Sequence, residues 1–291
     1  MAESREYACP WCGRASAIGP DALTCPACGA AVDVRRTADD AGWVQLPPIR
    51  DMARLQFGAS RCQVEGNYVP VADFDLAAGD HLYFNHHVLL WKEPRTALSP
   101  VPLRGWWRRL WAGLPLVMVR AHGPGRVAFS NDAPGEIIAV PLAAGTSIDV
   151  RAGAFLVASG QITYDWLAAG VWYRTGEGMH YPLGRYLDRF TAADGHGLLL
   201  LHGAGNVFVR DLAPGETRLV KPTALVYADP RVTMSLHIEH PRGFNNYWRR
   251  RYVWLSLCGP GRVAIQSAGR HWEDPHYPVT EMSVGSGVTD W

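Results

Sequence analysis

Two short phrases, each present three times, constrain the fold of this chain more than any other feature. The first reads Gly-Pro-Gly-Arg-Val-Ala at residues 123–128 and 259–264, with a looser copy, Gly-Ala-Gly-Asn-Val-Phe, at 203–208. The second is Leu-x-x-Gly, ending at Gly79, Gly145 and Gly215. The second phrase precedes the first by 44 residues in the outer copies and by 58 in the middle copy, which predicts an insertion of 14 residues there. Matched spacing of two landmarks predicts one supersecondary unit used three times.

Short strands are expected on both sides of the first phrase. Apolar runs at residues 116–120, 198–201 and 252–257 lead into it, and alternating apolar residues follow it. An apolar run, a glycine turn and an alternating run are typical of a β-hairpin. No long amphipathic helix is evident, and the best candidates, residues 106–112 and 185–190, span a turn or two each. This pattern predicts an all-β sandwich or barrel built from repeats.

Four of the six cysteines form a metal-binding pattern in the first 28 residues. Cys9 and Cys12 make one Cys-x-x-Cys pair, and Cys25 and Cys28 make a second after twelve residues. Two thiolate pairs at this spacing predict a tetrahedral zinc site, with iron as the competing metal. Because all four ligands are cysteines, the expected Zn2+ is structural, and metal binding supplies most of the stability of so small a module. The ribbon carries no net charge, which favours protein contact over nucleic acid.

The expected fold class is therefore all-β, with a small N-terminal four-cysteine zinc ribbon followed by a β-sandwich domain of three pseudo-repeats. Residues 1–33 form the predicted ribbon, and residues 34–50, which end near Pro47 and Pro48, form a linker. Residues 51–291 form the three-copy β domain, with approximate copies at 53–131, 136–210 and 211–268.

Composition and charge bear on location and partners. The net charge of +1 gives no overall attraction to nucleic acid or anionic lipid. No secretory signal is visible, and the longest apolar run, residues 110–119, is too short to span a bilayer and contains Gly113 and Pro115. We expect a cytoplasmic protein.

The order and spacing of several motifs resemble the altered-inheritance-of-mitochondria family over about residues 53–268. The matching residues are Leu76-x-x-Gly79, Leu142-x-x-Gly145 with residues 153–157, Leu212-x-Pro-Gly215 with residues 224–230, and the three Gly-x-Gly-x-Val turns. The resemblance implies a β-sandwich repeat fold similar to the tryptophan RNA-binding attenuation protein, with copies packed like neighbouring subunits of a ring. It further implies a non-enzymatic protein without agreed catalytic residues, whose mitochondrial members are associated with inner-membrane organisation.

Tryptophan and arginine are concentrated before two of the Gly-x-Gly turns, and the middle copy has a thinner version in Arg185, Tyr186, Arg189 and Phe190. The candidate interaction residues are Arg104, Trp106, Trp107, Arg108, Arg109, Trp111, Trp248, Arg249, Arg250 and Arg251. Such segments suit a protein contact, a membrane interface or stacked single-stranded nucleic acid. They equally suit packing between repeats, with arginines stacked over buried tryptophans.

The histidines provide only weak signals for catalysis. His81, His86 and His87 cluster in the first copy, and His237 and His240 lie together in the third. A cupin-type metal site needs histidines on one face of a strand, but the adjacent His86 and His87 point to opposite faces. No nucleophile elbow or phosphate-binding lysine loop is present. We therefore expect no enzyme, with a cupin-type metalloenzyme as a remote alternative.

The sequence thus predicts a non-enzymatic interaction or scaffold protein. The expected partner is an unidentified protein or a second copy of the chain, and assembly is expected through repeat edges or the tryptophan–arginine segments. Peripheral membrane contact is a further expectation. The alternative function is a nucleic-acid-binding or regulatory protein that uses the ribbon and the same segments, although its near-neutral charge disfavours nucleic acid.

Overall fold

The protein is all-β throughout the part of the chain that the structure describes, which confirms the predicted class. The computed structural model describes residues 5–8, 14–19, 26–27, 53–102, 117–193, 195–239, 252–269 and 281–283. The only helical elements in these ranges are two single 3-10 turns, η1 (His86–Val88) and η2 (Pro222–Ala224).

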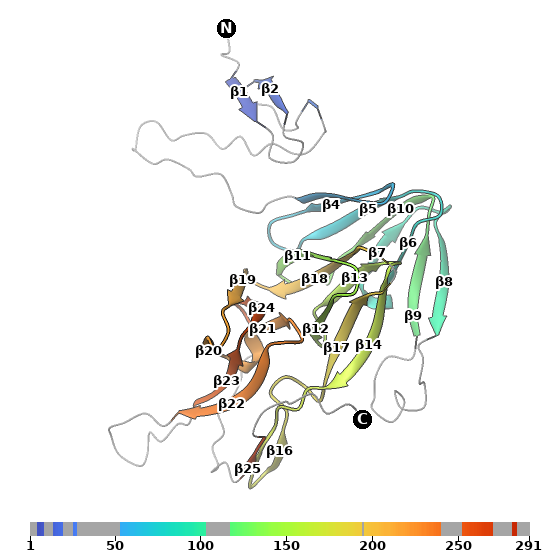
Figure 1. The fold of residues 1–291 in the computed structure, drawn as a ribbon. Coiled ribbons are helices and arrows are strands. Elements are labelled where there is room, and N and C mark those ends of the chain that lie inside the picture. Colours follow the sequence, from blue (N-terminus) through green and yellow to red (C-terminus); the bar gives the residue numbers. More distant parts are fainter. Residues whose placement is uncertain are drawn as a thin grey trace.

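Six strands in the same order make up each of three copies (Figure 1). The first copy contains β5 (Val71–Leu76), β6 (His81–Phe84), β7 (Leu89–Lys92), β8 (Ala97–Pro102), β9 (Val117–His122) and β10 (Gly125–Phe129). The second contains β11 (Gly135–Leu142), β12 (Ser147–Arg151), β13 (Phe155–Ser159), β14 (Ile162–Ala168), β17 (Tyr186–Ala192) and β18 (Gly197–Ala204). The third contains β19 (Val207–Leu212), β20 (Thr217–Val220), β21 (Leu225–Ala228), β22 (Thr233–Glu239), β23 (Tyr252–Cys258) and β24 (Gly261–Gln266).

The remaining strands are additions to this plan. They are β1 (Arg5–Ala8), β2 (Ala15–Ile18), β3 (Ala53–Phe57), β4 (Ser60–Glu65), β15 (Tyr173–Thr175), β16 (Gly178–His180) and β25 (Glu281–Met282). β1 pairs with β2, and the β3–β4 hairpin extends the first copy at β5. The β15–β16 hairpin lies in the connection between β14 and β17.

Each copy has the same antiparallel pairing within it. The sixth strand pairs with the first and the third, as β10 does with β5 and β7. The fifth strand pairs with the second and the fourth, as β9 does with β6 and β8. The copy is thereby divided between two sheets, each of which contains three of its strands.

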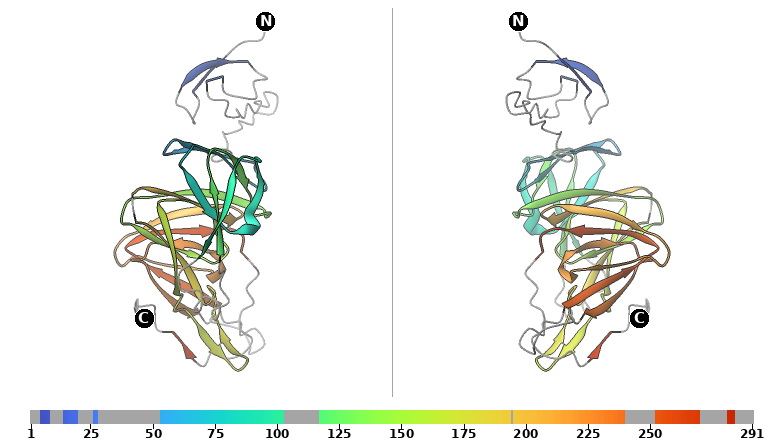
Figure 2. Two further views of the ribbon diagram at one scale, coloured as in Figure 1. Left: turned by 90° about the vertical axis from the view of Figure 1, so that its right-hand side faces the viewer. Right: turned by 90° about the vertical axis from the view of Figure 1, so that its left-hand side faces the viewer.

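Neighbouring copies are joined by one further rule: the second strand of a copy pairs with the third strand of the next. β6 pairs with β13, and β12 pairs with β21. Each junction fuses two three-stranded halves into a six-stranded sheet. The first copy, coloured blue to green, lies at one end of the domain, and the third, orange to red, at the other (Figures 1 and 2).

The three Leu-x-x-Gly phrases hold equivalent positions, since each connects the first and second strands of its copy. Gly79, Gly145 and Gly215 have φ values of 91°, 76° and 77°. These angles lie in the left-handed region that glycine adopts without steric cost, which explains why glycine ends each phrase.

The hairpin interpretation of the Gly-x-Gly phrases is wrong. Gly123–Gly125 leads from β9 to β10, yet β9 and β10 belong to different sheets and do not pair with each other. β23 and β24 are separated in the same way around Gly259–Gly261. The phrase is an arch between the two sheets of a copy. An arch and a hairpin share the same local pattern, because both need an apolar strand on each side of a tight turn.

The middle copy of this phrase is also displaced from its predicted place. Gly125 pairs with Leu76 and Gly261 pairs with Leu212, and in the middle copy it is Gly197 that pairs with Leu142. The phrase at 203–208 instead connects β18 to β19, which belong to successive copies. The predicted insertion of 14 residues, which is counted to this phrase, is therefore wrong. Gly195 is the equivalent of Gly123 and follows Gly145 by 50 residues, so the middle copy is six residues longer over this stretch than the outer copies. β19 precedes the Leu212 turn and pairs with β24, so the third copy includes residues before the predicted boundary at 211.

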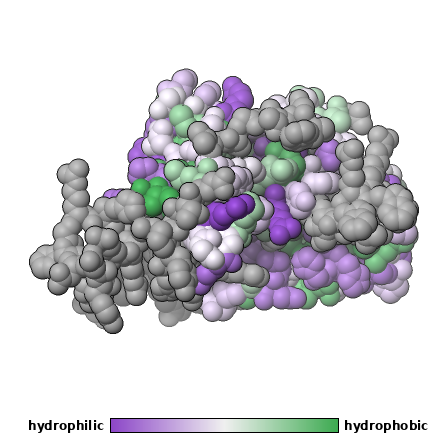
Figure 3. Space-filling view, turned by 90° about the horizontal axis from the view of Figure 1, so that it is seen from below, coloured by the Kyte–Doolittle hydropathy of each residue, from purple (hydrophilic) through white to green (hydrophobic). Residues whose placement is uncertain are grey.

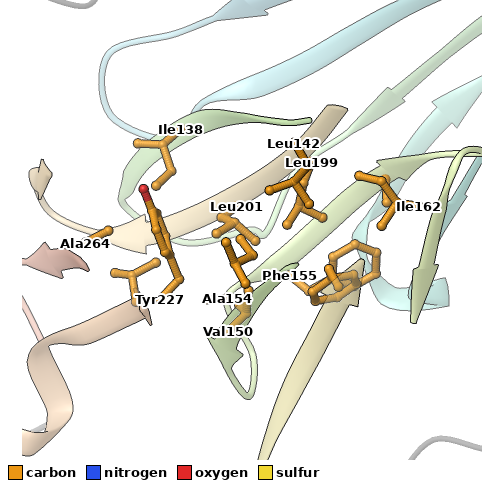
Figure 4. Close-up of a cluster of buried hydrophobic side chains, with 14 of the residues drawn as sticks. Ile138, Leu142, Val150, Ala154, Phe155, Ile162, Leu199, Leu201, Tyr227 and Ala264 are labelled. Carbon is orange, nitrogen blue, oxygen red and sulfur yellow. The ribbon is translucent and has the colours of Figure 1, made fainter. Parts of the chain in front are cut away.

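Three hydrophobic cores correspond to the three copies. The central core gathers side chains from both six-stranded sheets, and Figure 4 shows Leu199, Leu201 and Phe155 facing Val150 and Tyr227. Tyr227 comes from the third copy, yet it packs in the core of the second. Val157 of the second copy packs in the core of the first in the same way. The cores are therefore completed across the junctions between copies.

Candidate interaction surface

The sequence-predicted site residues fall mostly outside the described part of the chain. Cys9, Cys12, Cys25 and Cys28 lie outside it, so the zinc site stays a prediction. The same holds for all ten interaction candidates between Arg104 and Trp111 and between Trp248 and Arg251.

The thinner tryptophan–arginine equivalent in the middle copy is described, and it forms part of the fold. Phe190 is fully buried on β17, where its ring packs against that of Phe155 at a tilt of 31°, with ring centroids 4.6 Å apart. Arg189 Nε and Nη2 donate to Asp149 Oδ1 and Oδ2 at 2.7 and 2.9 Å. In this copy Phe190 and Arg189 pack within the domain, whereas Arg185 is exposed and its guanidinium lies 5.1 Å from the centre of the Tyr181 ring.

Exposed apolar side chains have a specific distribution in the described ranges. Seven of the nine large hydrophobic residues that are exposed lie on strands, and all seven are on strands at the edge of a sheet. They are Leu90 and Trp91 on β7, Leu98 on β8, Met179 on β16, Phe208 on β19, Leu219 on β20 and Met282 on β25. On the face seen in Figure 3, described hydrophobic residues are scattered among hydrophilic ones. The apolar surface is therefore distributed along sheet edges.

The edge strand β7 presents the most apolar of these edges. Leu90 and Trp91 are 49% and 40% exposed. Val88, the last residue of η1, is buried, and its carbonyl accepts from Ser130 N at 2.9 Å, which positions the start of the strand. The guanidinium of Arg126 lies 5.8 Å from the centre of the Trp91 ring, within cation–π range. This contact keeps the indole against the protein while leaving its outer face exposed.

Charged groups follow the apolar residues of β7. Lys92 Nζ donates to the carbonyl oxygens of Glu93 and Thr96 at 3.2 and 3.1 Å. Arg95 Nε donates to Glu93 Oε2 at 2.6 Å, and this hydrogen bond lowers the pKa of the Glu93 carboxyl. Glu93 is thus a carboxylate at neutral pH, placed directly after an exposed apolar edge.

The edge strand β20 also exposes an apolar side chain. Leu219 is 44% exposed, and the strand pairs with β23 on one side only in the described part of the chain. Arg218 Nη2 lies 2.7 Å from Glu216 Oε1. The backbone N–H of Ala213 donates to Glu216 and is the main cause of the lowered pKa of this carboxyl. β20 therefore offers an apolar side chain flanked by an arginine.

Arginines after the Gly-Pro-Gly arches carry local ion pairs. Arg126 pairs with Asp73, and Arg262 Nε donates to Asp211 Oδ1 at 2.8 Å. An open depression beside Arg262 is lined by Asp211, Asp229 and Arg231. Because two aspartates and two arginines line it, their charges offset one another, and the depression has no strong preference for a charged ligand.

The described histidines do not form a metal site. His81 lies on β6, His86 and His87 lie in η1, and His237 lies on β22, while His240 is outside the described residues. Within the described ranges, no group of three or more His, Cys, Asp or Glu side chains is placed to hold a metal ion. Ser99 Oγ and His122 Nε2 are 2.8 Å apart. No described carboxylate bonds the other ring nitrogen of His122, so no complete catalytic triad forms there.

Sequence reasoning missed Leu90, Trp91 and Leu219 as surface residues. Leu90 and Trp91 lie on a short apolar strand whose sequence resembles the buried strands of the other copies, and Leu219 lies on a strand of mixed composition. What identifies these residues is the rank of their strand, meaning its position in the order of six strands within a copy. β7 is the third strand of the first copy, and β20 is the second strand of the last. Only at these two ends does a strand of that rank lack a neighbouring copy within the described chain.

Comparisons with known proteins agree with this fold. The family model described as mitochondrial biogenesis AIM24 matches residues 62–268. The X-ray crystal structure of a protein from Streptococcus pyogenes is similar, with a TM-score of 0.52 and 21% identity over 72% of this chain and 94% of that one. Among curated proteins, none matches this chain. No helix in the described residues is long and apolar enough to cross a membrane.

Proposed function

The chain belongs to the mitochondrial biogenesis AIM24 family, and from this premise we propose that it is a non-enzymatic scaffold protein that binds other proteins through the edges of its sheets. The observation that carries the proposal is the location of the exposed apolar strand residues, all of which lie on edge strands. An edge strand offers unpaired backbone N–H and C=O groups, and apolar side chains beside them give a partner strand something to bury.

The described polar groups also support this proposal. The arginine–carboxylate clusters are paired among themselves, and the buried Asp149 is held by Arg189. The edge strands therefore remain as the surfaces that offer unpaired backbone N–H and C=O groups to a partner. Interaction surfaces of this kind are apolar at the centre and polar at the rim, as at β7, where Leu90 and Trp91 are followed by Lys92 and Glu93.

The predicted zinc ribbon extends the proposal. β1 and β2 pair antiparallel, from Arg5 opposite Ile18 to Ala8 opposite Ala15, and Cys9 and Cys12 lie in the connection between them. An antiparallel strand pair with a Cys-x-x-Cys pair in the intervening sequence is consistent with a zinc ribbon. We assign the module a structural Zn2+ and a role in protein contact. A cytoplasmic location is part of the same proposal, and cell fractionation tests it.

Affinity purification from the native cell tests the proposed function. The tagged full-length protein is compared with a version lacking residues 1–33 and with two edge variants, Leu98→Lys on β8 and Phe208→Lys on β19. Loss of co-purifying protein in one or both edge variants supports binding through sheet edges. The matched control is Tyr68→Lys, because Tyr68 is 74% exposed but lies in a loop.

Two results would contradict the proposal. One is a wild-type protein that has the mass of a single chain by light scattering and captures nothing. The other is a set of partners that Leu98→Lys and Phe208→Lys both leave unchanged. Fluorescence titration with single-stranded RNA at low salt tests the alternative function, since binding through stacked tryptophans would quench their emission in a salt-sensitive way.

A further inference from the structure

The two junctions inside the chain use the same strand register. At the first, Phe84 of β6 lies opposite Val157 of β13, and Tyr83 lies opposite Ala158. At the second, Val150 of β12 lies opposite Tyr227 of β21, and Asp149 lies opposite Ala228. Val157 and Tyr227 occupy the same position in their copies, since each follows a bulge against the sixth strand. The junction is therefore a repeated interface with a fixed register.

The Leu-x-x-Gly turns and the pairing with the sixth strand place the end strands in the same frame. Phe84 and Val150 each lie five residues after the glycine of their turn, Gly79 or Gly145. The residue five positions after Gly215 is Val220, on β20. β7 shows the same bulge against β10, between the pairs Ala128–Trp91 and Phe129–Leu89. Trp91 is thus the first-copy equivalent of Val157 and Tyr227.

Burial separates the internal junctions from the two ends. Phe84, Val157, Val150 and Tyr227 are all buried. Trp91 and its neighbour Leu90 are exposed on β7, and Leu219 is exposed on β20. Strands that pair with a neighbouring copy are thus covered, whereas β7 and β20, which have no such partner in the described chain, are open.

We propose that β20 of one chain pairs antiparallel with β7 of a second copy of the chain, in the register of the internal junctions. This inference rests on the proposed function and identifies one of its partners. The five-stranded sheet that ends at β7 and the three-stranded sheet that begins at β20 then form one continuous sheet across two chains. Because the two surfaces differ, the contact is head-to-tail and produces a ring or a filament.

The side chains brought together in this register are complementary. Val220 faces Trp91, a β-branched residue against an aromatic one, which is a favourable cross-strand pair. Leu219 faces Lys92, whose aliphatic stem can cover it while the ammonium group stays in water. Arg218 faces Glu93, a pair of opposite charges. No like charges meet at these three positions.

The hydrophobic cores give an independent reason for the same contact. Val157 of the second copy packs in the core of the first, and Tyr227 of the third copy packs in the core of the second. By the same rule, Trp91 of the next chain packs against the core of the third copy. Val220 already lies at the border of that core. The largest side chain of the series therefore fills the place that no residue of the same chain occupies in the described structure.

Charge reversal tests the junction. Sedimentation velocity is measured for the wild-type protein, for Glu93→Arg, for Arg218→Glu, and for an equimolar mixture of the two variants. Each variant alone places like charges opposite each other, so we expect association at least about tenfold weaker than wild type. In the mixture every junction again joins opposite charges, so assembly returns with alternating chains. The matched controls are Arg61→Glu and Glu65→Arg, which alter exposed residues of β4 away from both edges and keep the wild-type mass.

The outcomes separate this inference from the proposed function. A wild-type protein with single-chain mass at every concentration overturns the junction, and so does an assembly that the two reversals leave unchanged or that mixing fails to restore. In those cases partner capture that is lost in Leu98→Lys or Phe208→Lys still supports binding through other edges. Far-ultraviolet circular dichroism confirms that each variant retains its β-sheet content.

Discussion

Gly123 lies directly against the carbonyl oxygen of Ala77, so that a Cβ on this glycine would overlap that oxygen. Gly259 meets the carbonyl of Ala213 in the same way. The arch between the two sheets of a copy is therefore packed on the Leu-x-x-Gly turn of the same copy. The two phrases recur together because the glycine of the arch has to pack against the backbone of the Leu-x-x-Gly turn.

This contact predicts a steric penalty at Gly123. Gly123→Ala should reduce the free energy of unfolding by about 2 kcal/mol, because the added methyl group has to displace backbone. Gly79→Ala is the matched control, since its Cβ has open space but its φ is 91°. That variant should lose roughly 1 kcal/mol from backbone strain alone. Urea denaturation measures both, and equal losses would contradict the packing explanation.

The stability of the connection between the first and second copies should depend on pH, because His202 holds this connection in place. Asn131 Nδ2 donates to His202 Nδ1 at 3.0 Å, and His202 Nε2 donates to the carbonyl of Ala133 at 3.1 Å. Burial lowers the pKa of His202 below its ordinary value of 6.5, so the folded state favours the neutral ring. The unfolded chain binds the proton more readily, and this contribution to stability is present above pH 6.5 and is lost as the pH falls towards the folded pKa.

Thermal unfolding between pH 7.5 and 5 measures this effect. The slope due to His202 is at most about 1.4 kcal/mol per pH unit. His202→Gln should flatten the profile relative to wild type, while His237→Gln, at an exposed position of β22, should leave it unchanged. The prediction fails if both variants follow the wild-type profile.

Two ion pairs in the domain should differ sharply in how much they contribute to the free energy of unfolding. Asp149 is buried and receives two hydrogen bonds from Arg189, whereas Asp211 and Arg262 are both exposed. Asp149→Ala removes the carboxylate paired with the partly buried guanidinium of Arg189 and should cost about 3–5 kcal/mol. Asp211→Ala should cost about 1 kcal/mol or less. If chemical denaturation gave similar losses in the free energy of unfolding for both variants, burial would not control how much these pairs stabilise the fold.

The predicted zinc site can be tested without reference to the β domain. Cys9→Ser/Cys12→Ser should abolish zinc binding measured by elemental analysis, because a four-thiolate site cannot retain the metal with two ligands. The main unfolding transition should keep its midpoint, since the three cores are built from residues after position 53. Metal that persists in this variant would indicate a different site.

Much of the β domain can be predicted from its turns. The three Leu-x-x-Gly phrases identify equivalent connections, because the left-handed backbone at Gly79 and its counterparts needs glycine wherever it occurs. The all-β class follows from the same short strands and glycine turns. What local sequence cannot provide is the sheet to which each strand belongs, as the Gly123–Gly125 arch shows.

The failures have physical causes that concern particular residues. Gly197 was missed because its phrase continues with Leu198 and Leu199, where the outer copies have arginine and valine. Residues 185–190 were considered for a short helix, yet β17 pairs along its length with β12 and β14. Tertiary pairing overrides a weak local preference there. The exposure of Trp91 could not be predicted, because it depends on where the series of copies ends.

The placement of Tyr227 in a neighbour's core has a consequence for how this chain can be divided. A fragment cut after β18 would keep all six strands of the second copy and yet lack a wall of its interior. We expect such a fragment to be poorly soluble despite its complete strand set. Truncations designed at repeat boundaries would therefore yield proteins with an incomplete core. The unit that can be duplicated or lost without loss of stability is larger than the unit that the sequence repeats.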